Sequence, residues 1–432
     1  MRVAIYTLGC KVNQYETQAM EQELLRRGHT LVPAETEADG YIVNTCSVTA
    51  ISDKKSRQMI RRCHKLNPNA VVAACGCYVQ THPEVVAALD VDLLAGTGDR
   101  MAFLDLFEQA AHEKEPVRLL DDALRRREFE VLPAGGMAER TRAMLKVEDG
   151  CVNFCTYCII PYARGAVRSL PADQAAEQAK GLARQGYREL VITGIELSTY
   201  GRDLPGRPDL ASLIEAVCHA VPEMRVRLGS LEPRTVTEDF CARLAALPNL
   251  CPHFHLSLQS GSDTVLARMK RKYTTQRFLE SVRLLRTHFD RPALTTDLIV
   301  GFPGETEEEF QETLAFLQRC AFAQMHIFPY SRRQGTPAAS MPGQLSNAEK
   351  ASRAHRGAEL AQAMERSWLT GWIGQTVPVL FEEEKDGFWR GHTPQYIEVL
   401  VKGEHLHNQL RPVTITAAGD SLAYGTVKEE QP

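Results

Sequence analysis

The sequence lacks long uncharged apolar runs. No stretch approaches the roughly 18 uncharged apolar residues that a membrane-spanning helix needs, and the apolar start MRVAIYTLGC shows no signal-peptide cleavage pattern. Its 44% hydrophobic and 24% charged residues are typical of a globular protein. We therefore expect a cytoplasmic protein with no membrane segment.

An excess of one charge sign is also missing, since the formal net charge is only -4. The chain as a whole thus gives no indication of nucleic-acid binding, which would have to depend on local patches. Repeats and low-complexity tracts are absent as well. At 432 residues the chain is too long for a single hydrophobic core, and we expect two to three domains.

The chain begins with alternating strands and helices. Short apolar runs, RVAIYT, GYIVNT and AVVAAC, are typical of strands, and helical stretches such as NQYETQAMEQELLRRG lie between them. Strands separated by helices predict a parallel α/β sheet. The next stretch is charged and then rich in Pro and Gly, ALRRREFEVLPAGGMAER, and it indicates a linker.

A second series of strands and helices starts near Arg142. Six predicted strands with crossover helices lie between residues 143 and 330. They predict an open, partial (β/α)6 barrel rather than a closed eight-stranded one. After residue 370 the chain has short strands and turns with no helical pattern, which is typical of a small β-barrel.

Three of the 12 cysteines, Cys151, Cys155 and Cys158, lie within eight residues. In a reducing cytoplasm, clustered thiols indicate metal or redox chemistry rather than disulfides. A structural zinc site needs a fourth ligand, and the next thiol, Cys218, is 60 residues further on. Three thiolates on an iron–sulfur cube leave one iron open for a substrate. A zinc knuckle closed by a remote ligand, or three unrelated core thiols, are the alternatives.

Three further cysteines follow predicted strands of the first sheet. Cys10, Cys46 and Cys77 each lie within three residues of a strand end, and the carboxyl ends of parallel strands share one edge where ligands bind. They could converge on a second open-iron cluster. Cys75 competes with Cys77, which we prefer because Gly76 ends the strand and frees the next residue to turn toward the edge. The remaining cysteines are expected to serve packing: Cys63, Cys218, Cys241, Cys251 and Cys320.

The stretch GCVNFCTYCIIPYARG resembles the radical S-adenosylmethionine (SAM) signature, Cys-x3-Cys-x-aromatic-Cys, with Tyr157 at the aromatic position. The resemblance implies that the open iron chelates the amino and carboxylate groups of SAM. It also implies that an electron from the cluster cleaves SAM to a 5′-deoxyadenosyl radical. The cofactor itself would then be the missing fourth ligand.

Blocks along essentially the whole chain are similar to those of the methylthiotransferase family, in the same order: TLGCKVNQYET, VNTCSVT, GCY, CVNFCTYCIIPYARG, HLSLQSGSD, VGFPGET and FPYSRRQGTPAA. Members attach a methylthio group to an unactivated carbon. The resemblance implies two [4Fe-4S] clusters, SAM, a sulfur donor and a reductant such as flavodoxin or ferredoxin. It implies an N-terminal methylthiotransferase domain with the auxiliary cluster (1–112), a linker (113–140), a radical SAM core (141–368) and a TRAM-like β-barrel (370–432).

Further cofactor-binding residues are expected at the ends of barrel strands. The segment TGIEL occupies the place of the family's SAM-amine loop but departs from its Gly-Gly-Glu pattern, so Glu196 could equally be a solvated acid. Asp297 lies within an apolar strand and needs a partner or a ligand. Arg164 and Arg168 flank the cysteine loop and could serve SAM or an RNA phosphate, or simply be surface charges. Candidates for the SAM pocket are Tyr157, Gly194, Glu196, Ser230, Gln259 and Asp297.

Short basic runs indicate where a nucleic acid could bind. Four cations recur at three- and four-residue spacing and would line one helix face: Lys54, Arg57, Arg61 and Lys65. The runs RMKRK and RRR add two more patches. Each alone is more often a solvated face, but three on a chain of net negative charge indicate a phosphate-binding surface.

Within the family the chain is most similar to the branch that modifies carbon-2 of threonylcarbamoyladenosine beside the anticodon, judged on YTLGCKVNQYET and SVTAISDKKSRQ. The partner would be a tRNA anticodon stem-loop. Because this base carries a carboxylate, its pocket should offer a cation, and Arg332 and Arg333 are candidates. The alternative substrates are isopentenyladenosine in tRNA and an aspartate of a ribosomal protein. A different class altogether is an RNA-binding protein with a structural metal.

Overall fold

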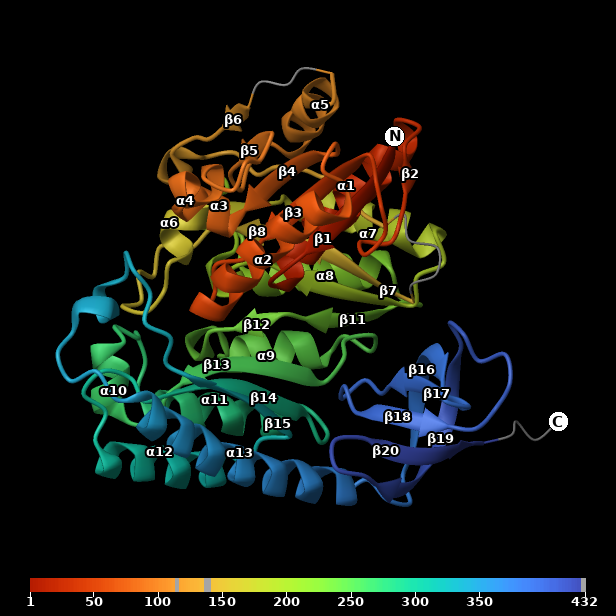
Figure 1. Cartoon of the computed structure of the whole chain (residues 1–432). Coiled ribbons are helices and arrows are strands. Elements are labelled where there is room, and N and C mark those ends of the chain that lie inside the picture. Colours follow the sequence, from red (N-terminus) through yellow and green to blue (C-terminus); the bar gives the residue numbers. More distant parts are fainter. Residues whose placement is uncertain (113–115, 136–140, 429–432) are drawn as a thin grey trace.

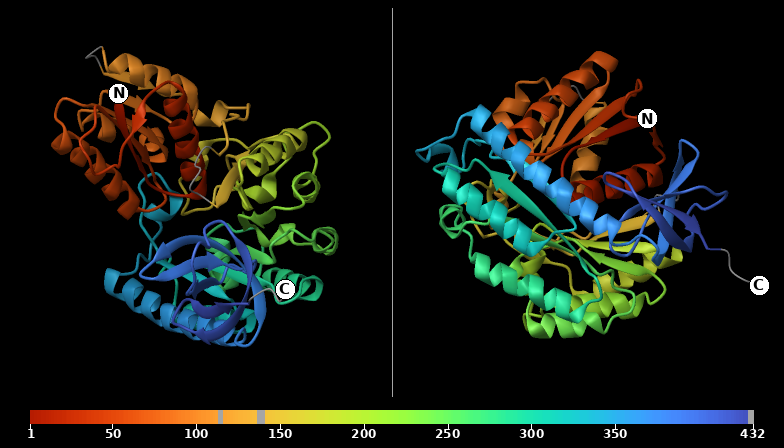
Figure 2. Two further views of the ribbon diagram at one scale, coloured as in Figure 1. Left: turned by 90° about the vertical axis from the view of Figure 1, so that its right-hand side faces the viewer. Right: turned by 90° about the horizontal axis from the view of Figure 1, so that it is seen from below.

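The computed structural model describes residues 1–112, 116–135 and 141–428. An N-terminal α/β unit lies over an open half-barrel, and a small β-barrel lies beside the half-barrel at the end of the long helix α13 (Asn347–Thr370) (Figures 1 and 2). The predicted fold class is confirmed: two parallel α/β units are followed by a closed barrel.

The N-terminal unit is a six-stranded parallel sheet in the order β2-β1-β3-β4-β5-β6. Its strands are β1 (Arg2–Thr7), β2 (Thr30–Leu31), β3 (Gly40–Thr45), β4 (Val71–Gly76), β5 (Leu93–Ala95) and β6 (Val117–Leu119). Its helices are α1 (Lys11–Arg26), α2 (Ala50–Leu66), α3 (Cys77–Thr81), α4 (Pro83–Ala87) and α5 (Arg100–Ala110). Apolar residues of α1 and α5 cover one face, and those of α2, α3 and α4 cover the other.

Strand β6 lies within residues 113–140, which the sequence indicated as a linker. It pairs with β5, with Val117 opposite Leu93, so the sheet extends past residue 112. Val117 and Leu119 pack against the core on the α1 and α5 side. Three residues are too few to show a strand pattern in the sequence. Residues 113–115 and 136–140 of the predicted linker lie outside the described residues.

The central unit is a half-barrel of parallel strands in two connected sheets, β11-β10-β7 and β12-β13-β14-β15. The strands are β7 (Arg142–Lys146), β10 (Glu189–Thr193), β11 (Arg225–Leu228), β12 (Ser230–Leu231), β13 (His253–Gln259), β14 (Ala293–Val300) and β15 (Gln324–Pro329). The predicted strand at 225–230 is divided at Gly229, whose N–H donates to the Ile192 carbonyl at 2.8 Å. The two halves of that strand therefore belong to different sheets, β11 to the first and β12 to the second.

Helices cover the outside of the half-barrel (Figure 1). They are α7 (Ala172–Arg184), α8 (Leu210–Ala220), α9 (Glu238–Ala245), α10 (Asp263–Arg268), α11 (Thr275–His288) and α12 (Glu307–Cys320). Capping boxes begin α12 at Thr306 and α13 at Ser346, where each side chain accepts the N–H three residues on. Short elements complete the unit: β8 (Glu148–Asp149), α6 (Ile160–Arg164), β9 (Arg168–Ser169) and the 3-10 helices η1 (Ala123–Arg125), η2 (Leu197–Thr199), η3 (Pro233–Thr235) and η4 (Pro337–Ser340).

The C-terminal unit is a closed five-stranded barrel in the order β16-β17-β18-β20-β19. Its strands are β16 (Thr376–Lys385), β17 (Phe388–His392), β18 (Glu398–Val401), β19 (Leu410–Ala418) and β20 (Ala423–Val427). Val379, Phe381 and Val399 are fully buried in its core. Across the described ranges, no helix is long and apolar enough to cross a membrane.

Candidate active site

The cysteine loop of the half-barrel joins β8 to α6, beyond the carboxyl end of β7, as predicted. The Cys151 N–H donates to the Gly165 carbonyl at 3.0 Å and closes the base of the loop. Gly150 has φ 95°, and a Cβ there would lie 2.0 Å from the Ala166 carbonyl oxygen, so only glycine fits. The glycines of the sequence therefore fold the segment back on itself and gather its three thiols.

Two of the three thiols of this loop, Cys151 and Cys158, have pKa values above the usual range. Burial, with further repulsion from the Cys155 thiol, raises the pKa of Cys158 to about 11. Burial and the charges of Glu196 and the other two thiols raise the pKa of Cys151 as well. A bound metal reverses such shifts because it stabilises thiolates. In the described part of the chain no three potential ligands surround a single point, and an iron–sulfur cube needs none to, since each cysteine binds a different iron.

Arg271 supplies a cation to this loop. Its Nη1 donates to Cys155 Sγ at 3.3 Å, and its guanidinium lies over the ring of Tyr273, 4.9 Å from the centroid. The neighbouring Lys272 donates to Asn153 Oδ1 at 3.1 Å. The run RMKRK, which the sequence indicated as a phosphate-binding patch, therefore turns two of its cations toward the cysteine loop. From the sequence alone, a cation that contacts the cysteine loop cannot be distinguished from one that binds phosphate.

Three of the predicted SAM-pocket residues lie in the cysteine loop or beside the chain that leads into it. Glu196 accepts a hydrogen bond from Asn153 Nδ2 at 3.2 Å, and burial followed by repulsion from Glu232 raises its pKa. Tyr157 packs in the apolar cluster that contains Phe302 and Tyr330. Gly194 lies where a Cβ would be 2.8 Å from Glu148 Oε2, so its lack of a side chain admits that buried carboxyl.

The other three candidates lie on the inner strands. Gln259 ends β13 with φ 69°, beside a register shift in that strand. Ser230 begins β12 and lines a large cavity, as does Asp297 of β14. The partner that Asp297 required is His255, whose Nε2 lies 3.2 Å from Asp297 Oδ2.

Cys10, Cys46 and Cys77 meet at the carboxyl edge of the N-terminal sheet. Cys10 precedes α1, Cys46 follows β3, and Cys77 begins α3. A Cβ on Gly9 would lie 2.9 Å from Cys46 Sγ, so the chain before Cys10 passes directly against that thiol. Burial, together with repulsion from Cys10 and Cys46, raises the pKa of Cys77 to about 12.

Cys75 lies on the opposite side of the sheet. Its side chain packs in the apolar cluster with Phe103 and Phe107, and burial raises its pKa to about 11 with no contribution from Cys10 or Cys46. Gly76 separates Cys75 from Cys77 and has φ 101°. The turn at this glycine sends the two thiols to different surroundings. The five cysteines predicted to serve packing are all buried: Cys63, Cys218, Cys241, Cys251 and Cys320.

Arg164 connects the two cysteine sites. It is fully buried, its Nη1 pairs with Glu16 of α1, and its Nη2 donates to Asn13 Oδ1 at 2.7 Å. A hydrogen bond from Arg164 also partly offsets the rise that burial causes in the pKa of Cys77. Arg168 is likewise buried and lies 3.3 Å from Asp149. These two arginines are therefore neither surface charges nor free for a phosphate.

Glu16 joins three cations in this buried network. Besides Arg164 it pairs with Arg100 at 3.0 Å and with Lys146 at 3.5 Å. Attraction to Arg164 and the other two cations outweighs burial and lowers the pKa of Glu16, so the carboxylate stays charged. The network fixes α1, which follows Cys10, against α6, which follows Cys158.

Arg333 forms a second connection between the units. It is buried, and its Nη2 donates to Ser47 Oγ at 2.7 Å and lies 3.2 Å from Asp53 Oδ2. Its Nε and Nη1 have no hydrogen-bond partner among the residues that the structure describes. Arg332 is exposed and donates from Nε to the Ala339 carbonyl at 2.7 Å. Neither arginine lines the large cavity, so the structure does not place them where we expected a substrate cation.

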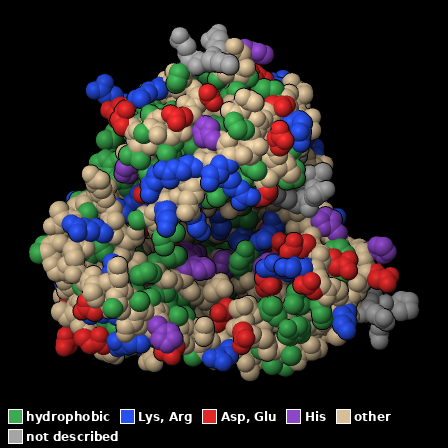
Figure 3. Space-filling view, in the orientation of Figure 1, with side chains coloured by type: hydrophobic (Ala, Val, Ile, Leu, Met, Phe, Trp, Pro, Cys, Tyr) green, Lys and Arg blue, Asp and Glu red, His purple; other side chains and the backbone are tan. Residues whose placement is uncertain are grey.

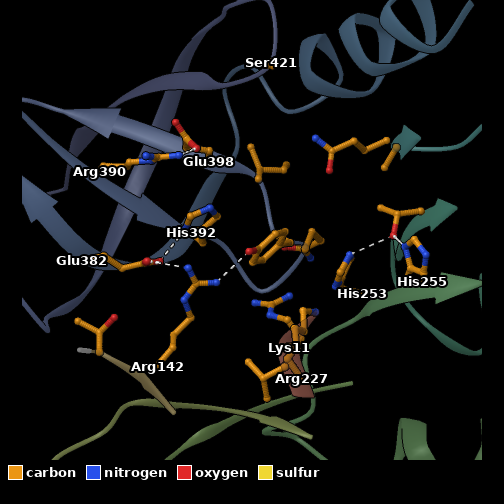
Figure 4. A pocket seen from close by; sticks show the side chains of 18 of the residues that line it. Lys11, Arg142, Arg227, His253, His255, Glu382, Arg390, His392, Glu398 and Ser421 are labelled. Carbon is orange, nitrogen blue, oxygen red and sulfur yellow. Dashed lines mark hydrogen bonds and ion pairs between the residues drawn. The ribbon is translucent and has the colours of Figure 1, made fainter. Parts of the chain in front are cut away.

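This cavity has a volume of about 1310 Å³ and lies between the half-barrel, the first turn of α1 and the C-terminal barrel (Figure 4). Most of its cations are paired. Arg142 lies 2.7 Å from Glu382 and donates to the Tyr396 hydroxyl at 3.0 Å, while Arg227 makes two bonds to Glu189 at 2.8 and 3.0 Å. Lys11 of α1 extends into the same space.

The basic face of α2 lies beside a hollow in the surface of the molecule (Figure 3). Lys54, Arg61 and Lys65 are exposed, together with Lys55 and Arg62. Figure 3 shows a band of Lys and Arg side chains over α2 and a hollow in the surface beneath it. Arg57 is partly committed, because its Nη1 donates to the Tyr78 hydroxyl at 2.6 Å.

Comparison with known proteins identifies the superfamily of the central unit. Residues 145–317 match the Radical SAM superfamily, and residues 2–96 match the family described as Uncharacterized protein family UPF0004. The structure of the radical S-adenosylmethionine methyltransferase TsrM from Kitasatospora setae has a TM-score of 0.57, with 16% identity over 78% of this chain and 77% of that one. The fold and the cysteine loop thus define a radical SAM enzyme, which uses SAM and a [4Fe-4S] cluster.

Two relatives are similar along nearly their whole length. The threonylcarbamoyladenosine tRNA methylthiotransferase MtaB of Bacillus subtilis is 39% identical, covering 96% of this chain and 94% of the relative. The tRNA-2-methylthio-N(6)-dimethylallyladenosine synthase of Symbiobacterium thermophilum is 34% identical, covering 99% and 94%. The chain belongs to the methylthiotransferase family of radical SAM enzymes.

Proposed function

We propose that the protein adds a methylthio group to carbon-2 of threonylcarbamoyladenosine next to the anticodon of tRNA. The observation that carries this is the similarity, along nearly the full length of both chains, to a threonylcarbamoyladenosine tRNA methylthiotransferase. The geometry supports it: one large cavity is bounded by α1, which follows Cys10, and by the radical SAM half-barrel.

We assign the cluster ligands to the two cysteine triads. Cys151, Cys155 and Cys158 would hold the SAM-binding [4Fe-4S] cluster, and Arg271 would favour their thiolates. The edge triad would hold a second [4Fe-4S] cluster, with Cys10, Cys46 and Cys77 as ligands. Cys77 is favoured over Cys75 because only Cys77 shares its electrostatic surroundings with the other two thiols. When bound, SAM and the reduced cluster supply the one-electron chemistry that activates an unactivated carbon–hydrogen bond.

The chain's own residues would orient SAM and the base. Glu196, half-buried beside Asn153 and near Cys151, is placed to accept a hydrogen bond from an amino group of SAM. We retain Tyr157, Gly194 and Gln259 as walls of the same pocket. Ser230 and Asp297 face the large cavity, which is also open to the substrate base.

The anticodon stem-loop would bind across the basic face of α2. Its cations lie beside the hollow in the surface, and exposed Lys and Arg side chains there would neutralise phosphates (Figure 3). A reductant such as flavodoxin or ferredoxin and a separate sulfur donor would complete the reaction. We expect the protein in the cytoplasm, where tRNA is modified.

A second candidate function is methylthiolation of isopentenyladenosine in tRNA, since a dimethylallyladenosine synthase is also similar along the full length. Both reactions use the same carbon and the same pair of cysteine sites. They differ in the substituent on N6, which is anionic in one base and apolar in the other. The residues around that substituent therefore decide between them.

The deciding experiment offers reduced, reconstituted enzyme and SAM to tRNAs that carry threonylcarbamoyladenosine, isopentenyladenosine or unmodified adenosine. Mass spectrometry of the nucleosides should show methylthiolation of the threonylcarbamoyl form. Modification of the isopentenyl form alone would establish the second candidate. Equal modification of unmodified tRNA would show that the side chain is not recognised.

A further inference from the structure

Lys11 differs from every other Lys and Arg that lines the large cavity. Within residues 1–112, 116–135 and 141–428, no hydrogen bond or ion pair involves its side chain, whereas Arg142, Arg227 and Arg390 are all paired. Figure 4 shows Lys11 extending from α1 into the cavity near Arg227 and His253. The cavity thus contains one amine that is free to meet a ligand.

The surroundings of Lys11 favour an anion. Arg227 and Arg142 line the same cavity, and each is held by its own carboxylate, Glu189 and Glu382. Asp297 lines the cavity as well, but this acid pairs with His255 at 3.2 Å. No carboxylate of the described chain forms an ion pair with Lys11, so a negative ligand would gain attraction from it without displacing a protein partner.

Lys11 also lies beside the proposed second cluster, whose ligands are Cys10, Cys46 and Cys77. It directly follows Cys10 and begins α1, and the Gln14 N–H donates to the Cys10 carbonyl at 3.1 Å. The backbone at Cys10 and Lys11 is therefore held by the helix, while the four-carbon stem of the lysine carries its charge into the cavity. Any group that reacts near Cys10 comes within reach of this side chain.

The substrate of the proposed reaction carries an anionic group close to the carbon that reacts. In adenine, carbon-2 and the carbon that bears N6 flank the same ring nitrogen, so both lie on one edge of the base. A base that presents carbon-2 to the Cys10 triad therefore directs its N6 substituent along the same wall. In threonylcarbamoyladenosine that substituent ends in a carboxylate.

We propose that Lys11 binds this carboxylate and selects the threonylcarbamoyl base over an apolar N6 substituent. The proposal rests on the proposed function and identifies its specificity-determining cation. The two arginines predicted from the sequence do not fit this role. Arg333 is paired with Asp53, and Arg332 lies outside the cavity.

The test compares two substrates that differ only in this charge. Reconstituted holoenzyme receives anticodon stem-loops that carry threonylcarbamoyladenosine or its uncharged methyl ester. The wild-type enzyme should prefer the acid by roughly 10- to 100-fold in kcat/KM, the range of a hydrogen bond to a charged group. Lys11→Met should remove the preference, and Lys11→Arg should retain most of it.

Controls separate recognition from damage to the neighbouring cluster. SAM cleavage without RNA and iron content are both measured for Lys11→Met, because Lys11 adjoins Cys10. A variant that loses iron is still judged by its acid-to-ester ratio, which does not depend on the loaded fraction. Arg332→Met should keep the wild-type ratio.

The outcomes distinguish the two proposals. A wild-type enzyme that acts only on isopentenyladenosine would overturn the proposed function itself. A wild-type enzyme that prefers the threonylcarbamoyl base, together with a Lys11→Met variant that keeps its acid-to-ester ratio, would overturn the role of Lys11 alone. Loss of the ratio in Arg332→Met rather than in Lys11→Met would transfer the role to Arg332.

Discussion

The two cysteine triads are brought together by different routes. Cys151, Cys155 and Cys158 lie on one loop, closed by a backbone hydrogen bond between Cys151 and Gly165. Cys10, Cys46 and Cys77 come from three strand ends and meet only when β1, β3 and β4 are paired. The first site is a local structure, whereas the second is a property of the whole sheet. A change in the sheet should therefore damage the second site more than the first.

Removing a triad should give the largest effects, and the two removals should differ in whether SAM cleavage persists. With Cys151, Cys155 and Cys158 replaced by Ala, SAM cleavage should be abolished while about half of the iron remains. With Cys10, Cys46 and Cys77 replaced by Ala, 5′-deoxyadenosine formation should persist and methylthiolation should be lost. Iron analysis and product chromatography measure both. If either triple variant loses both activities and all iron, the sites are not independent.

A single pair of substitutions sharpens the assignment within the sheet. Cys77→Ala should abolish methylthiolation, whereas Cys75→Ala should retain it, because Cys75 packs on the far side of β4. Iron content and methylthiolated nucleoside are measured for each variant. An active Cys77→Ala with an inactive Cys75→Ala would reverse the ligand choice.

Substitution of Arg164 tests how much the buried connection between the two cysteine sites stabilises the fold. Arg164→Met would leave Glu16 and Asp149 with fewer cations in a fully buried network, so we expect the free energy of unfolding to fall by about 3–5 kcal/mol. Urea denaturation measures the change. Arg184→Met on the exposed part of α7 is the control and should have little effect. Equal stability of the two variants would show that the buried connection is unimportant.

Arg271 should affect only the loop cluster. Arg271→Gln removes a positive hydrogen-bond donor from Cys155, so the reduction potential of that cluster should become more negative, by roughly 60 mV if the equilibrium constant changes tenfold. A redox titration followed by electron paramagnetic resonance measures it. Arg268→Gln is matched, since Arg268 belongs to the same basic run but pairs with Glu309. A shift in the reduction potential of the second cluster instead would show that Arg271 does not act on the loop cluster.

The smallest effects are expected on the surface of α2. Changing Lys54, Arg57, Arg61 and Lys65 to Gln should weaken tRNA binding and flatten its salt dependence by roughly 0.7–0.9 slope units for each phosphate that is no longer neutralised. Arg57 should contribute least because it is bound to Tyr78. Lys180→Gln with Arg184→Gln on α7 is the control. An unchanged slope would show that the α2 face is merely solvated.

Features that depend on local patterns could be predicted from the sequence. The half-barrel strands, the cysteine loop and the C-terminal barrel follow from periodicity and spacing. The meeting of Cys10, Cys46 and Cys77 could also be predicted, because the carboxyl ends of parallel strands share an edge. The preference for Cys77 depended on the turn that Gly76 allows.

Contacts between distant segments could not be predicted in this way. Arg164 and Glu16 are 148 residues apart, and Arg333 and Asp53 are 280 apart. A buried arginine has the same letter as a solvated one, so the sequence does not show that Arg164 and Arg333 are paired. Lys11 is the converse case: only the structure shows that its neighbours are paired and that, among the residues described, it has no ion-pair partner.

The bond between Arg333 and Ser47 also has a consequence for synthesis on the ribosome. Translation proceeds at about 5–20 residues per second, so Arg333 is made roughly 14–57 s after Ser47, given the separation of 286 residues. The sheet can form before then, with Ser47, the neighbour of Cys46, still without its arginine. During that interval the delivery of iron and sulfur to the proposed second cluster would compete with oxidation of the newly made thiol.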